Sequence, residues 1–318
     1  MIEFQLGEKD AAKKSALRSL ELAGPEPTVR AKMATVYAYW LGADQIGQVH
    51  DAAPAKNYGD GGWSTVPEVE MELPRCTVDQ RTNLTPQQFL EQYVEANAPV
   101  VVRGLLDGWH TWEAWSRKPF LKKHGKRLVG ATNSSEITRR QIVGQSEDLL
   151  LRVKDFVKQA MNSKRERVSE DPLYIFTKWG DDIRPDYNDF DFLKDSRWTL
   201  SQANRDKHAL FFVGPANSGT PMHMHSNTWN ALFYGRKLWF LTPPGHNPGS
   251  GLPGKWMNET MPRLTCPVYT CVQEPGETMW VPGDWGHATI NLRDSIGIAV
   301  ESGWDQTLPD RITPFLAN

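Results

Sequence analysis

The chain has 318 residues, 39% of them hydrophobic, and its formal net charge is −2 at pH 7. This is the composition of an ordinary soluble globular protein, and the near-neutral charge gives no argument for a nucleic-acid or membrane partner. The chain has no run of about 18 apolar residues, so we expect no membrane span. Its first residues, MIEFQLGEKDAAKK, lack the apolar core of a signal peptide, which makes the cytoplasm the default compartment.

The N-terminal part of the chain is predicted to be helical. Residues 8–23 are rich in Ala, Leu, Lys and Glu, and a second helix is expected over residues 30–42. Pro25 and Pro27 separate the two helices. Residues 51–65 are rich in Gly, Pro, Asp and Asn, which is typical of a linker.

After this linker the sequence alternates between a predicted helix and short apolar stretches that predict strands. The stretch TPQQFLEQYVEAN predicts a helix with Thr85 as N-cap, Pro86 at the first position and Gln88 completing a capping box. The apolar stretch APVVVRGLL follows as a buried strand, and PLYIFTKW predicts another strand further along the chain.

From about residue 208 onward the sequence consists of short apolar runs broken by Gly and Pro. These runs are HALFFVG, NALFYG, KLWFLTPP, YTCVQEPG, TMWVPG, HATINL and SIGIAVESG. Many short strands with regular turn signals predict an antiparallel barrel or sandwich. The three cysteines, Cys76, Cys266 and Cys271, do not make a disulfide scaffold, although one pair would form in an oxidising compartment.

Three histidines in this region form a candidate metal site. His223 and His225 precede a predicted strand, and their side chains would point the same way if the segment is extended. We interpret the pair as lying on one strand, with His287 after a tight turn on another strand of the same barrel. Imidazole binds Zn, Cu, Fe and Ni well, and three histidines on a rigid sheet leave coordination positions open for chemistry.

The surrounding residues match both halves of the cupin pattern. The first half is H-x-H with Asn230 in the acid position, and the second half contains Gly276, Pro282, His287 and Asn291. The run SGTPMHMH, YGRKLWFLTPP and PGETMWVPGDWGHATINLRDSIGIAV resembles the jumonji-C branch of that superfamily. DGGW, RCTV and APVVVRGLLDGW resemble the entry to the jumonji-C domain. Within the family, the chain most resembles the subgroup of jumonji-domain-containing protein eight, which also has H-x-H where most relatives have H-x-D/E.

The resemblance implies an all-β core, a double-stranded β-helix with flanking α-helices. Residues 1–60 would form a helical extension and linker, and residues 61–318 the barrel domain. It also implies Fe(II) as the metal, with Zn, Ni or Cu as substitutes in purified protein, and 2-oxoglutarate as cosubstrate. His223 and His287 match the two metal histidines of the family. Thr220 and Lys237 match the residues that bind the distal carboxylate of the cosubstrate.

His225 occupies the position at which most members of the family have a carboxylate. This difference leaves three hypotheses about the function open. The leading expectation is an oxygenase of the hydroxylase type that depends on Fe(II) and 2-oxoglutarate and has a tris-histidine site. The second is a tris-histidine cupin dioxygenase that does not use 2-oxoglutarate. The third is a metal-binding jumonji-C interaction module without catalysis.

The last predicted strand supplies one more candidate. In SIGIAVESG, Gly297, Ala299 and Glu301 share a face whose small residues would leave room for a ligand. We predict that Glu301 approaches the metal, directly or through a bound water, and acts as a catalytic residue. The alternative is that the strand ends by residue 300 and leaves Glu301 solvated at the rim. Trp285, near His287, either lines the site or packs in a turn.

The primary substrate is expected to be a protein, a peptide or a small molecule, and the sequence does not choose among them. No nucleic acid or membrane is expected as a partner, and the oligomeric state is left open. The family resemblance implies a secretory lumen as the alternative to the cytoplasm.

Overall fold

The computed structural model describes residues 9–22, 27–54, 56–64, 68–69, 71–82, 84–143, 148–161, 169–178, 181–190, 209–246 and 248–301. The α-helices are α2 (Lys9–Leu22), α3 (Pro27–Gly42), α4 (Pro86–Phe89), α5 (Thr111–Ala114), α6 (Arg117–His124), α7 (Ser134–Val143), α8 (Val153–Ala160) and α10 (Pro253–Lys255). The strands are β1 (Asp79–Thr82), β2 (Val100–Arg103), β3 (Leu128–Ala131), β4 (Leu149–Arg152), β5 (Ile175–Lys178), β6 (Ala209–Gly214), β7 (Thr228–Tyr234), β8 (Lys237–Thr242), β9 (Tyr269–Gln273), β10 (Glu277–Val281), β11 (Gly286–Asn291) and β12 (Ser295–Glu301).

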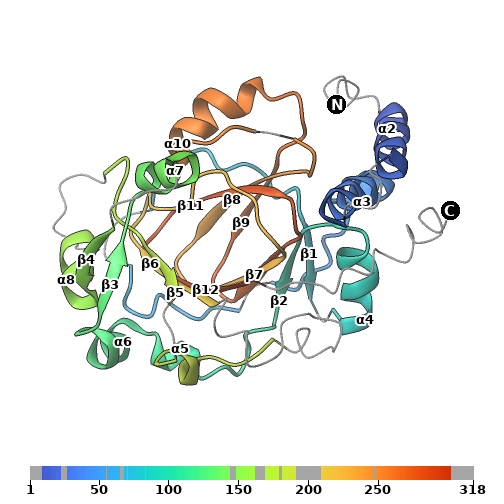
Figure 1. Cartoon of the computed structure of the whole chain (residues 1–318). Coiled ribbons are helices and arrows are strands. Elements are labelled where there is room, and N and C mark those ends of the chain that lie inside the picture. Colours follow the sequence, from blue (N-terminus) through green and yellow to red (C-terminus); the bar gives the residue numbers. More distant parts are fainter. Residues whose placement is uncertain are drawn as a thin grey trace.

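Two sheets form the core. The larger has seven strands in the order β1-β2-β10-β7-β12-β6-β5, and the smaller has three in the order β11-β8-β9. All neighbours are antiparallel except the parallel pair β1 and β2. From β7 onward the chain passes repeatedly between the two sheets, as it does in a double-stranded β-helix. The predicted all-β core with flanking helices is therefore confirmed (Figure 1).

The strands form where the sequence places short apolar runs between turn residues. Every residue of β7, β8, β10 and β11 is buried, because each of these strands has a covered face on both sides. Gly235 ends β7 with a φ of 96°, and a Cβ there would lie 2.5 Å from the Asp294 carbonyl oxygen. Glycine is thus required for the tight turn into β8.

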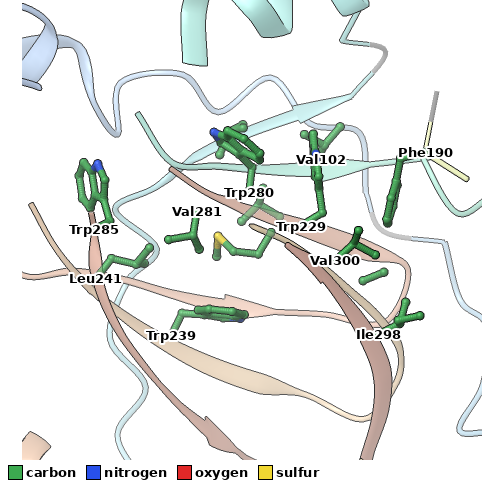
Figure 2. Packing of buried hydrophobic residues seen from close by; sticks show 14 of the residues in the cluster. Val102, Phe190, Trp229, Trp239, Leu241, Trp280, Val281, Trp285, Ile298 and Val300 are labelled. Carbon is green, nitrogen blue, oxygen red and sulfur yellow. The ribbon is translucent and has the colours of Figure 1, made fainter. Parts of the chain in front are cut away.

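Tryptophans fill the space on the outer face of the larger sheet. Trp229 on β7 lies opposite Trp280 on β10, and their ring centroids are 5.0 Å apart. Figure 2 shows these rings in a row with Phe190, beside Val102 of β2. Ile298 and Val300 of β12 belong to the same cluster. The predicted alternation of β12 is confirmed on this face, since its branched residues point away from the barrel interior.

Helices surround the barrel (Figure 1). Thr85 caps α4 with the predicted capping box. The Thr85 hydroxyl accepts from the Gln88 backbone N–H, and the Gln88 side-chain oxygen accepts from the Thr85 backbone N–H. A π-helical segment, Leu90–Val94, continues α4 and completes the predicted helix. Both N-terminal helices are present, and the second begins at Pro27, earlier than predicted. No helix among the residues that the structure describes is long and apolar enough to span a membrane.

A disulfide joins Cys76 to Cys271 of β9, whereas Cys266 is a free thiol. The bond connects the segment before β1 to the smaller sheet across 195 residues of sequence. We expect reduction to lower the free energy of unfolding by about 2–5 kcal/mol, because the unfolded chain then gains loop freedom. Chemical denaturation with and without reductant measures this loss. Alkylation of unfolded, unreduced protein should label Cys266 alone, and labelling of all three cysteines would contradict the pairing.

Candidate metal centre

Residues 217–225 run beside β11 and bring two histidines to the third. The backbone N–H of His223 donates to the His287 carbonyl at 3.0 Å, and the His287 N–H donates back at 2.8 Å. The Asp284 N–H also donates to the His225 carbonyl at 3.1 Å. Both sides of the site are thus tied by main-chain hydrogen bonds, which restrict how far the imidazoles can separate.

The histidine pair does not lie on a regular strand, so that part of the sequence interpretation is wrong. Of the two histidines, only His223 takes part in β-pairing, through an isolated bridge to His287, and the next strand, β7, begins at Thr228. The expected alternation of side chains still holds, because Met224 between the two histidines is 50% exposed. Hydrogen bonds to β11 and to the turn before it replace the ladder that a full strand would have supplied. His287 is on β11, as predicted.

Each imidazole uses its Nδ1 atom on a backbone carbonyl. The partners are Pro221 for His223 at 2.8 Å, Ser226 for His225 at 2.7 Å and Trp285 for His287 at 2.9 Å. A carbonyl can only accept, so every Nδ1 carries a proton. In the neutral ring, every Nε2 is therefore an unprotonated donor atom for a metal. Such hydrogen bonds are the usual way in which a metal-binding histidine is oriented.

These free ring nitrogens converge. One nitrogen from each of the three histidines lies within 4.8 Å of the others, and the Nε2 atoms of His225 and His287 are 3.1 Å apart. Two lone pairs at this separation repel each other unless a cation lies between them. Two nitrogens bound at right angles to one ion, each about 2.1 Å from it, would lie about 3 Å apart. The arrangement therefore fits a divalent transition metal, for which imidazole is a suitable ligand.

Desolvation keeps His223 and His287 neutral. Burial, followed by the nearby His225, lowers the pKa of His223 to about 4. Burial, followed by His223 and His225, lowers the pKa of His287 well below its ordinary value. Neutral imidazoles bind metal without first losing a proton, so the site is ready for metal at neutral pH.

All six residues predicted for the site line one pocket: Thr220, His223, His225, Lys237, His287 and Glu301. The pocket encloses about 370 Å³, part of it open to solvent, and its other lining residues include Tyr174, Asn230, Trp239 and Thr289. Trp239 is thus a wall residue, whereas the buried Trp285 donates its indole N–H to the Asn97 carbonyl and does not line the pocket.

Lys237 is the only cation among the described residues that line the pocket, and it is almost completely buried, at 1% exposure. Its Nζ donates to Asn291 Oδ1 at 2.7 Å and lies 3.4 Å from the Tyr174 hydroxyl. No carboxylate among the residues that the structure describes pairs with it. Burial therefore lowers the pKa of Lys237 to about 7. A buried amine without an anion is costly, which favours a site that receives an anion from outside.

Thr220 lines the same pocket as Lys237. Its backbone carbonyl accepts from the Thr289 N–H at 3.0 Å, and the hydroxyls of the two threonines are 3.0 Å apart. His287, Thr289 and Asn291 alternate along β11 and so share its inner face. This period of two could have identified Thr289 from the sequence once His287 was recognised.

Asn230 and Tyr174 complete the polar lining. Asn230 on β7 is buried, and its Oδ1 has no hydrogen-bond partner, so the pocket offers an unused acceptor. The Tyr174 hydroxyl faces Lys237, and burial raises the pKa of this tyrosine. The sequence carries no signal that assigns Tyr174 to the site, because its segment lies far from the histidine motif along the chain.

Glu301 is the last residue of β12 and pairs with Thr228 of β7. The strand therefore does not end at residue 300, and the alternative of a solvated residue beyond the strand is wrong. Ala299 and Glu301 both line the pocket, as predicted from the alternation of this strand. Within the part of the chain that the structure describes, Glu301 is the only acidic residue in the lining.

Comparison with known proteins gives matches along most of the chain. A family model described as "Cupin-like domain" matches residues 86–249, and one described as "JmjC domain, hydroxylase" matches residues 252–301. "JmjC domain-containing protein 8" from Homo sapiens is 30% identical over 253 residues, which cover 77% of this chain and 91% of the human protein.

Several relatives carry names that state an activity. The Caenorhabditis elegans "Bifunctional arginine demethylase and lysyl-hydroxylase psr-1" is 27% identical over 275 residues, covering 74% of this chain and 64% of that protein. The Gallus gallus "2-oxoglutarate and iron-dependent oxygenase JMJD4" is 26% identical over 253 residues, covering 70% of this chain and 58% of that protein.

Proposed function

Because the chain belongs to the family of cupin-like proteins with a JmjC domain, we propose that it is an oxygenase of the hydroxylase type that depends on Fe(II) and 2-oxoglutarate. The observation that carries the proposal is one pocket with three converging, unprotonated ring nitrogens and a buried lysine that pairs with no carboxylate of the described residues. The names of similar proteins that use iron and 2-oxoglutarate support the same reading.

In this proposal His223, His225 and His287 hold the iron. Iron held there supplies the redox chemistry that activates O₂. The protein orients the three rings through the carbonyls of Pro221, Ser226 and Trp285, so little freedom is lost on binding. Zn, Ni or Cu in purified protein would fit the same nitrogen donors.

Lys237 and Thr220 bind the distal carboxylate of 2-oxoglutarate. The Lys237 ammonium gains the anion that it lacks in the free protein, and the Thr220 hydroxyl donates a hydrogen bond. Asn291 Oδ1 already holds the ammonium, while Asn291 Nδ2 donates to Ser218 Oγ at 2.8 Å. This chain of bonds fixes the lysine before the cosubstrate arrives, which limits the entropy lost on binding.

Glu301 supplies the negative charge that the missing family carboxylate would have given. Three imidazoles leave the full charge of a divalent ion uncompensated, and Glu301 is the acid that shares their pocket. We expect Glu301→Gln to keep the metal and to lower turnover about 10- to 100-fold, as is typical when a residue that supports metal ligands is removed. Turnover and metal content, measured on the same samples, check this. Equal turnover in variant and wild type would contradict a catalytic role.

Formation of succinate tests the proposed activity. Iron-loaded protein is incubated in air with 2-oxoglutarate and ascorbate, a reductant that takes up the second oxygen atom of O₂ in place of the primary substrate. Succinate is measured by NMR, with protein stripped of metal as control. The proposal predicts succinate only with iron. Binding of 2-oxoglutarate without succinate would favour the non-catalytic module. Consumption of O₂ with a candidate substrate, but without any use of 2-oxoglutarate, would favour the cupin dioxygenase.

Further observations support a substrate class and a compartment. We propose a protein or peptide as the primary substrate, since similar proteins are named for activity on arginine and lysine.

The disulfide between Cys76 and Cys271 supports an oxidising compartment over the cytoplasm. We also propose that residues 1–60 form an extension and linker and that residues 61–318 form the barrel domain.

A further inference from the structure

The two-stranded sheet of β3 and β4 carries leucines in contact with solvent. Leu128 of β3 is 57% exposed, and Leu149 and Leu150 of β4 are 50% and 64% exposed. These are three of the six large hydrophobic residues that are exposed among the described residues. Figure 1 places this sheet at the margin of the molecule, beside α8. Exposed leucines next to an open strand edge are typical of an interaction surface.

The outer edge of β4 has backbone groups without partners. The Val153 N–H donates to the Arg127 carbonyl, so residues of odd number on β4 direct their hydrogen bonds toward β3. The same rule holds along β3, where even residues direct their backbone groups away from β4. Thr132, just after β3, accordingly exchanges two backbone hydrogen bonds with Tyr174. Both backbone groups of Leu150 and the N–H of Arg152 therefore point outward, whereas the C=O of Arg152, the N-cap of α8, accepts the first hydrogen bond of that helix. Among the described residues, β4 pairs with no strand other than β3.

The sequence of β4 is complementary to itself in the antiparallel direction. Asp148, Leu150 and Arg152 share one face of the strand. When a second copy is placed about a two-fold axis at Leu150, Asp148 of each copy lies opposite Arg152 of the other. The same placement makes Leu150 face its own counterpart, and all three pairs fall on the even residues whose backbone groups point outward. Hydrogen bonding, charge and hydrophobic contact thus agree in a single register.

We propose that β4 pairs with β4 of a second copy of this chain, so that two two-stranded sheets join into one of four strands. Four main-chain hydrogen bonds would form across the new edge: two between the facing Leu150 residues, and one from each Arg152 N–H to the Asp148 carbonyl of the other copy. Leu128 lies diagonal to Leu150 on the same face and would extend the contact. Shifting the axis to residue 149 or 151 keeps the hydrogen bonds but sets Leu150 against a charged residue.

The charges around β4 allow this arrangement. Arg140 Nη2 contacts Asp148 Oδ1 at 2.6 Å, which leaves Oδ2 of the carboxylate for Arg152 of the second copy. Arg152 is exposed and has no side-chain partner among the described residues. The contact is small, so the dimer should be weak and its population should depend on protein concentration.

Sedimentation of the full chain over a range of concentrations tests the pairing. We expect the wild type to shift from monomer to dimer as its concentration rises. Asp148→Arg or Arg152→Asp alone should weaken the dimer at least about 10-fold, because each change sets like charges opposite each other at two places. The double variant D148R/R152D restores opposite charges and should restore the dimer, which a folding defect would not do.

Leu22→Asp serves as the matched control, because Leu22 is 67% exposed on α2, which is a separate element. Thermal unfolding of each variant verifies that it is folded. A wild type that stays monomeric at every concentration would overturn the proposal. So would a dimer that is indifferent to the charge changes at Asp148 and Arg152. Neither result bears on the proposed oxygenase activity.

Discussion

Replacing His223 or His287 by alanine should abolish metal binding, with a loss of affinity of at least about 100-fold. Removing a hydrogen-bond partner of a metal ligand typically costs 10- to 100-fold, and removing the ligand itself should cost at least as much. His225→Ala should also lose the metal, because the Nε2 atoms of His225 and His287 are only 3.1 Å apart. The metal content of purified variants, measured by mass spectrometry after dialysis against the ion, provides the test.

Two further variants sharpen this test. His225→Asp installs the carboxylate that relatives have at this position, and we expect it to retain the metal. His246→Ala is the matched control, because His246 lies outside the pocket. Loss of metal in His223→Ala but not in His225→Ala would reduce the site to two histidines and contradict the tris-histidine arrangement.

Replacing Lys237 by methionine should weaken 2-oxoglutarate binding by about 10- to 100-fold and leave metal binding unchanged. A charge-assisted hydrogen bond in a buried site contributes about 1.5–3 kcal/mol, and this loss of affinity corresponds to it. Methionine fills similar space without a charge, so the free energy of unfolding should not fall. Lys178→Met is the matched control, because Lys178 is exposed on β5. Equal affinity in wild type and Lys237→Met would contradict the assignment.

The affinity for 2-oxoglutarate should also depend on pH. Burial lowers the pKa of Lys237 to about 7, and only the charged form attracts the carboxylate. As the pH rises above about 7, the free protein increasingly holds a neutral amine that must gain a proton on binding. Affinity should therefore fall by up to about 10-fold per pH unit. Lys237→Met should lack this dependence, which separates the lysine from other titrating groups.

Much of the fold and most of the site were accessible from the sequence for physical reasons. The barrel strands are short apolar runs between Gly and Pro, so their number and order follow from the turn signals. The inner face of β11 follows from alternation once His287 is assigned, and the same argument places Ala299 and Glu301.

Other features depend on contacts between distant segments and could not be predicted. Tyr174 reaches Lys237 only because β5 pairs with β6, and nothing local to β5 specifies that neighbour. The partner of Cys271 is Cys76 and not the nearby Cys266, a choice made by the fold of the whole chain. The position of α3 also depends on a contact between distant segments. Thr35 Oγ1 of this helix donates to Asp284 Oδ2, in the turn before His287, at 3.1 Å.

Calorimetric titration of the metal-loaded protein with 2-oxoglutarate tests whether the pocket of Lys237 and the three histidines binds this cosubstrate. We expect one molecule bound per chain, and much weaker binding of glutarate, which has both carboxylates but lacks the 2-oxo group. Absence of 2-oxoglutarate binding to metal-loaded wild type would contradict the proposed function, because Lys237 would then not bind the carboxylate of this cosubstrate.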